Sequence, residues 1–478
     1  MKKRYIVITT RYTAICFIVT ICLFIVSCGK DFLNVPVAST IIKQDYVKDL
    51  QTNQEFLNGI YYTLSTQLGS PSALYADIVA DNINPSAGFS VEQVQYLTHY
   101  NWQQNADDKT SSFSNMNHLS YSLYGVIASL NFSIESSIKF RSENAEKADL
   151  IRGQALTLRA LSYSYLLNFF AQPYSYTADA SHLGVAIQIS DDWRVLPKQR
   201  STVKEVYDYI IKDLNAAILL MPPIKGSTLF VNKYAAAGLL SRVLLAKGDY
   251  SNARKYARMV AEVMPLMTVN YPSKLFTLQE TEAIFQIPQN ERSPILFASF
   301  YLRTNVLYRP SADMVSLLNE SATDLRASWV TKVGNDWTVT KFPQSANSKI
   351  TIPSVSYYPT ILRSSEMYLI AAESYAQLNN TDSARFYLDA IRKRADATAI
   401  GTTASGNVLL EAIYKERRKE LAFEGHRMFD LLRWKKGVIR TNPLNVQYTE
   451  LPYPSNMAIA PIPLKDVQLA GMEQNPGY

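Results

Sequence analysis

The residues with the greatest capacity for chemistry lie in one stretch, ERRKELAFEGHRMFDLLRW, at 416–434. Carboxylates beside a histidine are the groups that general acid–base catalysis uses. A catalytic site is therefore one interpretation of this block. Its ionisable side chains are Glu416, Glu420, Glu424, Asp430, Arg417, Arg418, Arg427, Arg433 and His426.

The spacing within the block favours a structural role. Glu416, Glu420 and Glu424 lie four residues apart and would share one face of a helix. Arg417 lies three residues before Glu420 and can pair with it, and Gly425 is expected to end the helix. Charged runs with helical spacing usually serve packing or solvation. We therefore predict an ion-pair network that locks two helices and docks the C-terminal tail.

No other stretch carries a recognisable catalytic or metal-binding pattern. The sequence lacks a GxSxG elbow, a P-loop and an HExxH motif. Its four histidines, His99, His118, His182 and His426, are scattered and form no zinc-type ligand cluster in the sequence. A glycosidase pair needs a defined separation of two carboxylates, which a sequence does not show. We expect no metal and no cofactor.

The N-terminus has the layout of an export signal. Basic residues at 2–4 and Arg11 precede an uncharged apolar run at 15–26, which is short of the roughly 20 residues that span a bilayer. The run ends in Ile-Val-Ser-Cys, which resembles the lipobox of bacterial lipoproteins. Residues 1–27 would then be a lipoprotein signal peptide, and Cys28 would carry acyl chains such as palmitate. A short internal anchor with an incidental cysteine is the alternative.

Cleavage would change the charge and the cysteine content. Residues 1–27 hold four basic and no acidic side chains, so the formal charge falls from +7 to +3. This balance gives no argument for a nucleic-acid partner. Cys16 and Cys22 leave with the signal, so the mature chain has no cysteine pair for a disulfide.

Two stretches, 81–104 and 289–308, combine aromatic rings with amide, carboxylate and guanidinium groups, as a sugar-binding surface requires. We expect Trp102 near the centre of that surface, where its indole face can stack on a sugar ring. The alternative is that these aromatic side chains are half-buried loop anchors. The candidate ligand-binding residues are Asp81, Asn84, Phe89, Tyr96, Trp102, Tyr301 and Arg303.

Amphipathic helices must position these stretches. Residues 202–221 carry apolar residues at helical spacing, and Thr202 and Glu205 have the spacing of a capping box. Residues 233–246 repeat the apolar pattern, and a tight turn to a second helix is expected at Gly248.

This helix–turn–helix unit resembles a tetratricopeptide repeat. Small residues such as Ala237 and Ala253 would let its paired helices approach closely. A second unit is expected at 364–395, with further degenerate helix pairs at about 113–171 and 407–436. An ordinary helical bundle is the alternative.

The predicted fold class is mainly α: a tetratricopeptide-like helix-pair scaffold (an α–α superhelix) with an irregular, loop-rich second lobe. Short strands are expected in that lobe at TEAIFQIP and DWTVTKF. After the signal, the predicted parts are 28–265 with helix-pair repeats, 266–360 as the irregular ligand-side region, 361–437 with returning repeat helices, and 438–478 as an extended proline-rich tail docked on the scaffold.

Several stretches, spread from one end of the sequence to the other, share a pattern with known proteins: CGKDFLNVP at 28–36, YADIVADNI at 75–83, QALTLRALSYSYLLNFF at 154–170, RSTVKEVYDYIIKDLNAAILLMP at 200–222, YRPSADMVSLL at 308–318, TDLR at 323–326, KERRKELAFEGHRMFDLLRWKKG at 415–437 and the terminal APIPLKDVQLAGMEQNPGY. Together they resemble the SusD/RagB family of outer-membrane lipoproteins of Bacteroidetes, and the resemblance runs from end to end. One departure is AQPYSYT at 171–177, where the family often has a glycine-containing loop.

The resemblance implies a lipid-anchored protein of the cell surface that binds a nutrient, usually a glycan, and partners a SusC-like TonB-dependent transporter. It implies no catalytic activity. In starch-binding relatives the ligand residues fall in segments that roughly correspond to 81–104 and 289–308. Some relatives bind peptides, so a peptide ligand is an alternative, and an all-helical glycoside hydrolase is a third interpretation.

Overall fold

The structure is a computed structural model that describes residues 43–68, 74–86, 94–107, 116–287, 308–343 and 357–478, apart from residues 193, 196, 198, 444 and 445. The chain divides into two units, residues 1–48 and 49–478. The described part of the first unit contains the short helix α2 (Lys43–Tyr46). The predicted signal peptide and Cys28 lie outside the described residues.

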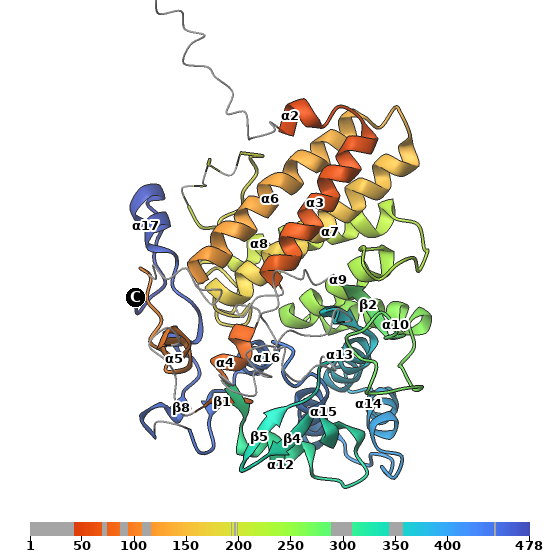
Figure 1. The fold of residues 1–478 in the computed structure, drawn as a ribbon, viewed down its shortest axis with the longest axis vertical. Coiled ribbons are helices and arrows are strands. Elements are labelled where there is room, and N and C mark those ends of the chain that lie inside the picture. The colour runs from red at the N-terminus through yellow and green to blue at the C-terminus, as the bar shows by residue number, and fades with distance from the viewer. Residues whose placement is uncertain are drawn as a thin grey trace, which may run out of the picture. The chain divides into compact units, whose positions relative to one another are not determined.

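Long helices open the second unit: α3 (Leu50–Leu68), α6 (Met116–Lys139), α7 (Ala145–Phe170) and α8 (Val203–Leu220). Helix α6 packs against both α3 and α7, and α7 packs against α8. Figure 1 shows α3, α6 and α7 side by side. The helix pair expected near 113–171 is therefore present as α6 and α7.

Helix α8 forms where the sequence predicts it. The Thr202 side chain accepts a hydrogen bond from the Glu205 backbone N–H, and the Glu205 carboxylate accepts one from the Thr202 N–H at 2.8 Å. This reciprocal pair satisfies two backbone donors at the helix start. The buried apolar face consists of Val203, Val206, Tyr207, Ile210, Leu214, Ala217, Ile218 and Met221.

Two tetratricopeptide-like pairs follow: α9 (Lys233–Lys247) with α10 (Tyr250–Val263), and α13 (Ser364–Gln377) with α14 (Thr381–Ala395). Helix α10 packs against both α9 and α13, so the pairs stack although they are far apart in the sequence. Gly248 ends α9 with φ +82°, a left-handed conformation that glycine adopts without a steric penalty.

Helix α15 (Gly406–Glu420) and helix α16 (Arg427–Arg433) occupy the stretch of the last expected pair, but α15 packs on α13 and α14 whereas α16 packs on α4. The expectation that the first of them continues to Gly425 is wrong. The backbone turns after Glu420, where Phe423 takes φ 66° and Gly425 takes φ 75°. A left-handed residue cannot continue a right-handed helix. The remaining short α-helices are α4 (Tyr75–Ile78), α5 (Val94–Tyr100), α12 (Ala312–Leu318) and α17 (Leu464–Ala470).

The described strands form small antiparallel pairs. The strands expected in TEAIFQIP and DWTVTKF are present as β2 and β5. The pairs are β1 (Ile83–Pro85) with β3 (Tyr308–Pro310), β2 (Ala283–Gln286) with β6 (Thr360–Arg363), β4 (Val330–Val333) with β5 (Asp336–Val339), and β7 (Val438–Ile439) with β8 (Glu450–Leu451).

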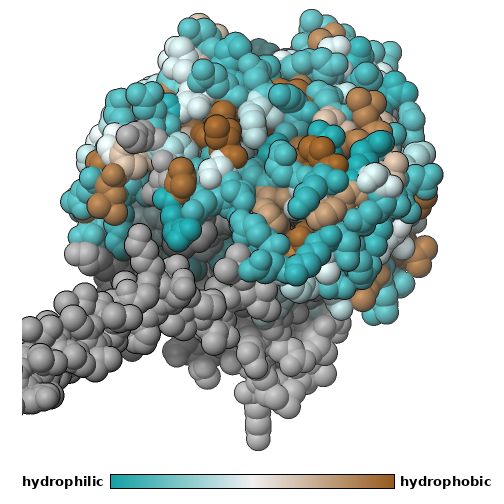
Figure 2. Space-filling model, turned by 90° about the horizontal axis from the view of Figure 1, so that it is seen from above, coloured by the Kyte–Doolittle hydropathy of each residue, from teal (hydrophilic) through white to brown (hydrophobic). Residues whose placement is uncertain are grey.

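The second unit has one large hydrophobic core, a smaller one, and a third group of three buried residues, Leu369, Ile391 and Leu421. The large core joins α3, α4, α6 to α10 and α13 to α16 with residues of the C-terminal tail such as Ile462. The smaller core gathers around Trp329, Tyr308 and Phe276 in the strand-containing part. Figure 2 shows the described residues of one face as mostly hydrophilic, with hydrophobic residues in small separate groups.

The mainly helical fold with tetratricopeptide-like pairs is confirmed. The boundaries that the sequence suggests within 49–478 stay a prediction. Helix α16, near the C-terminus, contacts α4, near the start of the described chain. This contact between distant parts of the sequence sets the geometry of the candidate site.

Candidate functional site

The two candidate ligand-binding stretches meet at a small sheet. Strand β1 lies in the first stretch, and strand β3 begins at the end of the second. In their antiparallel pairing Pro85 lies opposite Tyr308, and Asn84 lies opposite Arg309. The structure therefore places the described ends of the two stretches next to each other.

Asn84 is half-buried on β1, and its side-chain amide forms hydrogen bonds with other residues of the protein. Its Nδ2 donates to the carbonyl oxygens of Thr441 and Asn442 at 3.4 and 3.1 Å, and its Oδ1 accepts from the Tyr100 hydroxyl at 2.9 Å. These bonds tie β1 to α5 and to the C-terminal tail. Contact of Asn84 with a ligand stays a prediction.

Asp81 does not present its carboxylate to a ligand, contrary to the sequence prediction. The residue is only 7% exposed, and its two carboxylate oxygens accept hydrogen bonds from Arg427 at 2.6 and 2.8 Å. Burial alone would raise the pKa of Asp81, but the hydrogen bonds and the charges of Arg427 and Arg418 lower it. Asp81 is a buried ion-pair partner that holds the start of the first stretch.

The prediction that Trp102 offers an exposed stacking face is also wrong. The residue is 7% exposed and belongs to the large core. Its Nε1 donates to the Val79 carbonyl at 2.9 Å, and the Arg440 guanidinium lies 4.0 Å from its ring centroid. The ring is enclosed because packing and a cation–π contact stabilise it there. Trp102 is a buried core residue, more enclosed than the half-buried loop anchor of the alternative.

Arg440, which the sequence did not single out, holds this region together. Its guanidinium lies 3.6 Å from the Tyr100 ring centroid and donates to the carbonyl oxygens of Ala80 and Tyr100 at 2.8 and 2.7 Å. Burial lowers the pKa of Arg440 to about 10. The tail residue thus fixes the backbone on which α5 and the first stretch rest.

The other predicted site residues cannot be placed in the same way. Phe89, Tyr301 and Arg303 lie outside the described residues, and Tyr96 lies in α5 with a side chain that is likewise outside them. Gln103, after α5, is exposed and donates to the Tyr448 hydroxyl at 2.7 Å. Phe89, Tyr96, Tyr301 and Arg303 stay predictions for the ligand surface.

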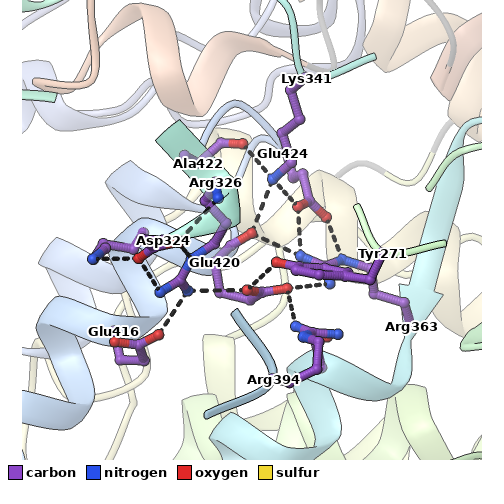
Figure 3. A network of polar contacts seen from close by, with 12 residues as sticks. Tyr271, Asp324, Arg326, Lys341, Arg363, Arg394, Glu416, Glu420, Ala422 and Glu424 are labelled. Carbon is purple, nitrogen blue, oxygen red and sulfur yellow. Dashed lines mark hydrogen bonds and ion pairs between the residues drawn. The ribbon is translucent and has the colours of Figure 1, made fainter. Parts of the chain in front are cut away.

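The charged block at 416–434 forms a buried ion-pair network, as its spacing favours. Glu420 is 0% exposed and lies at the centre of Figure 3. Its Oε1 accepts from Arg363 and Arg394, each at 2.7 Å, and its Oε2 accepts from Arg326 at 3.1 Å. The Tyr271 hydroxyl donates to the same Oε2 at 3.1 Å. Every described partner of this carboxylate is a donor from another element.

Glu424 extends the network beyond the end of α15. It accepts from Arg363 at 2.7 and 2.9 Å and pairs with Lys341 at 2.5 Å. The Lys341 ammonium also donates to the Glu420 and Ala422 carbonyl oxygens at 2.9 Å. Burial lowers the pKa of Lys341 to about 8, although the Glu424 charge opposes this shift. The turn after α15 is therefore held by buried charges (Figure 3).

The predicted pair between Arg417 and Glu420 does not form. Arg417 Nε instead donates to both carboxylate oxygens of Asp430, at 2.9 and 2.8 Å, and Arg433 Nε donates to Asp430 Oδ1 at 2.9 Å. Arg433 also pairs with Glu373 on α13. The Glu420 oxygens are already occupied by the arginines of other elements. The block therefore joins α15 to α16 and both helices to α13.

This arrangement gives the block little capacity for acid–base catalysis. Glu416, Glu420, Glu424 and Asp430 each pair with a cationic side chain. Burial alone would raise the pKa of Glu420, but Arg394, Arg363 and Arg326 hold it well below its usual range. A general base needs a pKa near the working pH and access to substrate. The interpretation as an ion-pair network is confirmed.

Among the residues that the structure describes, no group of three or more His, Cys, Asp or Glu residues could hold a metal ion. Within the same residues no helix has both the length and the apolar character that a membrane-spanning segment needs.

Comparisons with known proteins agree with this fold. A model of the SusD family matches residues 314–478. A second model, SusD-like 3, described as "Starch-binding associating with outer membrane", matches residues 31–245. SusD-like protein P2 of Formosa agariphila is 24% identical over 370 residues, which are 66% of this chain and 70% of that protein.

Solved structures are similar over nearly the whole chain. A SusD superfamily protein from Bacteroides thetaiotaomicron superposes with a TM-score of 0.80 at 24% identity and covers 90% of this chain and 100% of that one. A laminarin-binding SusD-like protein superposes with a TM-score of 0.68 at 20% identity, again over 90% of this chain and 100% of that one. At these identities the likeness establishes the fold. Taken together with the two family models, it shows that this chain belongs to the SusD/RagB family.

Proposed function

We propose that the mature chain is a cell-surface lipoprotein of the outer membrane that binds an oligosaccharide, does not cleave it, and passes it to a SusC-like TonB-dependent transporter. Membership of the SusD/RagB family supports this proposal. The description of one matching family model, which names starch binding and the outer membrane, supports it further. So does the likeness to a laminarin-binding protein.

The observation that carries the proposal is the meeting of two ligand-type stretches at β1 and β3. Both stretches are rich in aromatic and amide side chains, and a buried framework built on Arg440 and Asp81 holds the first of them. Aromatic faces stack on the apolar faces of sugar rings, while amide and guanidinium groups bind hydroxyls. Within these stretches the proposed contacts are Asn84, Phe89, Tyr96, Tyr301 and Arg303.

Titration with a panel of glycans tests the proposal. Tyr301→Ala should weaken binding of the preferred glycan by about 2 kcal/mol, roughly thirtyfold, because a few aromatic residues usually carry most of the affinity. Tyr62→Ala is the matched control, since Tyr62 is 54% exposed on α3. Equal affinity of wild type and both variants would remove Tyr301 from the site. Binding of peptides but of no glycan would replace the sugar by a peptide ligand.

The absence of cleavage and the transfer step have separate tests. The glycan should be recovered with unchanged chain length after incubation with purified protein, and release of shorter products would support a hydrolase instead. The transporter should copurify with the wild-type protein from detergent-solubilised outer membranes. If a TonB-dependent transporter is never retained, the proposed partner is wrong.

The proposed lipid anchor rests on Cys28 and the apolar run before it. Two or more acyl chains bury enough CH₂ groups for stable membrane attachment, whereas one is marginal. Cys28→Ala should abolish palmitate labelling and release the protein from the membrane fraction. Labelling that persists in the variant would contradict the anchor.

A further inference from the structure

Two pockets adjoin where α7, α9 and α16 meet, and they have volumes of about 70 and 80 Å³. The side chains that line both pockets are Asn168 from α7, Arg242 from α9, and His426 and Phe429 from the start of α16. None of these residues belongs to the two stretches that meet at β1 and β3. The two pockets are therefore lined differently from the proposed glycan surface.

The shared lining has unused hydrogen-bonding capacity. Asn168 and His426 have half-buried side chains, and neither side chain forms a hydrogen bond with another residue that the structure describes. Arg242 donates through Nε and Nη2 to Glu366 and the Ile361 carbonyl, which leaves its Nη1 unused there. An amide and a neutral imidazole can each donate and accept. The lining can therefore bind groups that do both, as hydroxyls do.

Two further atoms next to the first pocket lack partners. Arg417 Nη1 and Gln172 Oε1 are buried, and neither has a hydrogen-bond partner among the residues that the structure describes. Both side chains line this pocket. One atom is a donor and the other an acceptor, and leaving such groups unpaired costs free energy. A hydroxyl-bearing occupant could satisfy both kinds of group.

The charges around the pockets balance, which disfavours an ionic occupant. Arg242 pairs with Glu366 at 2.6 Å, Arg417 pairs with Asp430 at 2.8 Å, and Arg433 pairs with Glu373 and Asp430. Burial lowers the pKa of His426 to about 4, so its ring is neutral at neutral pH. A buried ion without its own counter-charge would pay a large desolvation cost.

Apolar walls complete both pockets. Phe429 contributes to both, while Leu245 and Tyr207 line the first and Tyr357 lines the second. Carbon-bound hydrogens of a small molecule can pack on such walls while its hydroxyls reach the polar side chains. A cavity needs about 10–15 Å³ to hold one water-sized group. Pockets of about 70 and 80 Å³ therefore each accept about six such groups.

We propose that these pockets form a second binding site, for a small neutral polyhydroxylated molecule: a polyol or a monosaccharide. Asn168 and His426 bind its hydroxyls, Arg242 Nη1 donates to a hydroxyl oxygen, and Phe429 packs on its carbon skeleton. This site does not depend on the proposed glycan surface.

Binding measurements with defined probes test this site. The probes are glycerol, xylitol, myo-inositol and glucose, with acetate and methylammonium as charged comparisons, in calorimetric titration and saturation-transfer NMR. Wild type should bind at least one neutral probe saturably in the millimolar range. Asn168→Leu, which removes the amide, and Ala246→Leu, which fills the first pocket, should each weaken binding by about tenfold or more.

Ala216→Leu is the matched control because Ala216 is also a half-buried helical alanine but lines neither pocket. It should bind as wild type does. If Ala246→Leu fails to fold in thermal melts, Asn168→Leu decides the test. Equal binding by Asn168→Leu and wild type, stronger binding of acetate or methylammonium, or no saturable binding of any neutral probe would overturn the proposal.

Discussion

Two regions of the molecule are stabilised by different kinds of contact. One is the helix pair α9 and α10, and the other is the charged block at 416–434. Ala237 on α9 and Ala253 on α10 are both 0% exposed, so these helices meet through small apolar side chains. Glu420 is also 0% exposed, but its contacts are three arginines and a tyrosine hydroxyl. One contact depends on shape and the other on matched charge.

The two kinds of contact should fail differently. An alanine contact tolerates loss of volume but resists added volume, because the helices cannot separate without exposing the core. A buried charge contributes little net stability while it is paired, yet removing one partner leaves the others uncompensated. The charged block should therefore be the more sensitive region to a single substitution, and the helix pair the more sensitive to overpacking.

Glu420→Ala should have the largest effect. It would remove the buried carboxylate that pairs with all three of Arg326, Arg363 and Arg394, at a cost of about 5 kcal/mol in the free energy of unfolding. Chemical denaturation measures this loss. Glu411→Ala is the control, because the Glu411 side chain is 61% exposed in its pair with Lys436 and should change stability by less than about 1 kcal/mol. A Glu420 variant as stable as this control would contradict the role of the network.

Trp102→Ala combines both kinds of contact and should rank next. The substitution removes a core ring and the aromatic face next to Arg440, and it should destabilise the protein by about 4 kcal/mol. Thermal melts and denaturant titration check this value. Trp337→Ala is the comparison, because Trp337 is only half-buried on β5. If Trp102→Ala had the melting temperature of wild type and lost affinity for the glycan, Trp102 would belong to the ligand surface after all.

Ala253→Trp should have a moderate effect, of about 1–3 kcal/mol, because the added ring must enter the tight contact of α10 with α9 and α13. Ser251→Trp, at an exposed position of the same helix, should stay within about 0.5 kcal/mol of wild type. Denaturant midpoints of the two variants compare them directly. Equal midpoints would mean that close alanine packing does not hold this helix pair.

The last prediction concerns the pH dependence of stability. Burial, with a contribution from Glu282, raises the pKa of Glu280 from 4.5 to about 8. The contribution of Glu280 to the free energy of unfolding is therefore fully present below pH 4.5. It is lost as pH rises towards and through about 8, and the free energy of unfolding falls by at most about 1.4 kcal/mol per pH unit. Glu280→Gln should remove this slope. Parallel stability curves for wild type and variant between about pH 5 and pH 8 would contradict the assignment.

The apolar helices could be predicted because their signals are local. In α8 the capping residues Thr202 and Glu205 and the buried stripe all lie within one short segment. Gly248 likewise marks its turn by a conformation that favours glycine. Such signals do not depend on which partner covers the helix, so a single sequence contains them.

The partners of the buried polar residues could not be predicted in this way. Glu420 pairs with arginines that lie 26, 57 and 94 residues earlier in the chain. Trp102 and Asp81 have the composition of a sugar site, but Arg440 and Arg427, which enclose them, come from near the C-terminus. Residue type indicates what a side chain can bind, whereas its partner depends on the tertiary fold.

Hydrogen–deuterium exchange with and without a bound glycan tests the central claim, that a glycan binds where β1 and β3 bring two stretches together. We predict protection in peptides from 86–104 and 288–308, and none in peptides from α14, with the glycan recovered intact. Protection confined to other parts of the chain, or a glycan shortened during the measurement, would contradict the account.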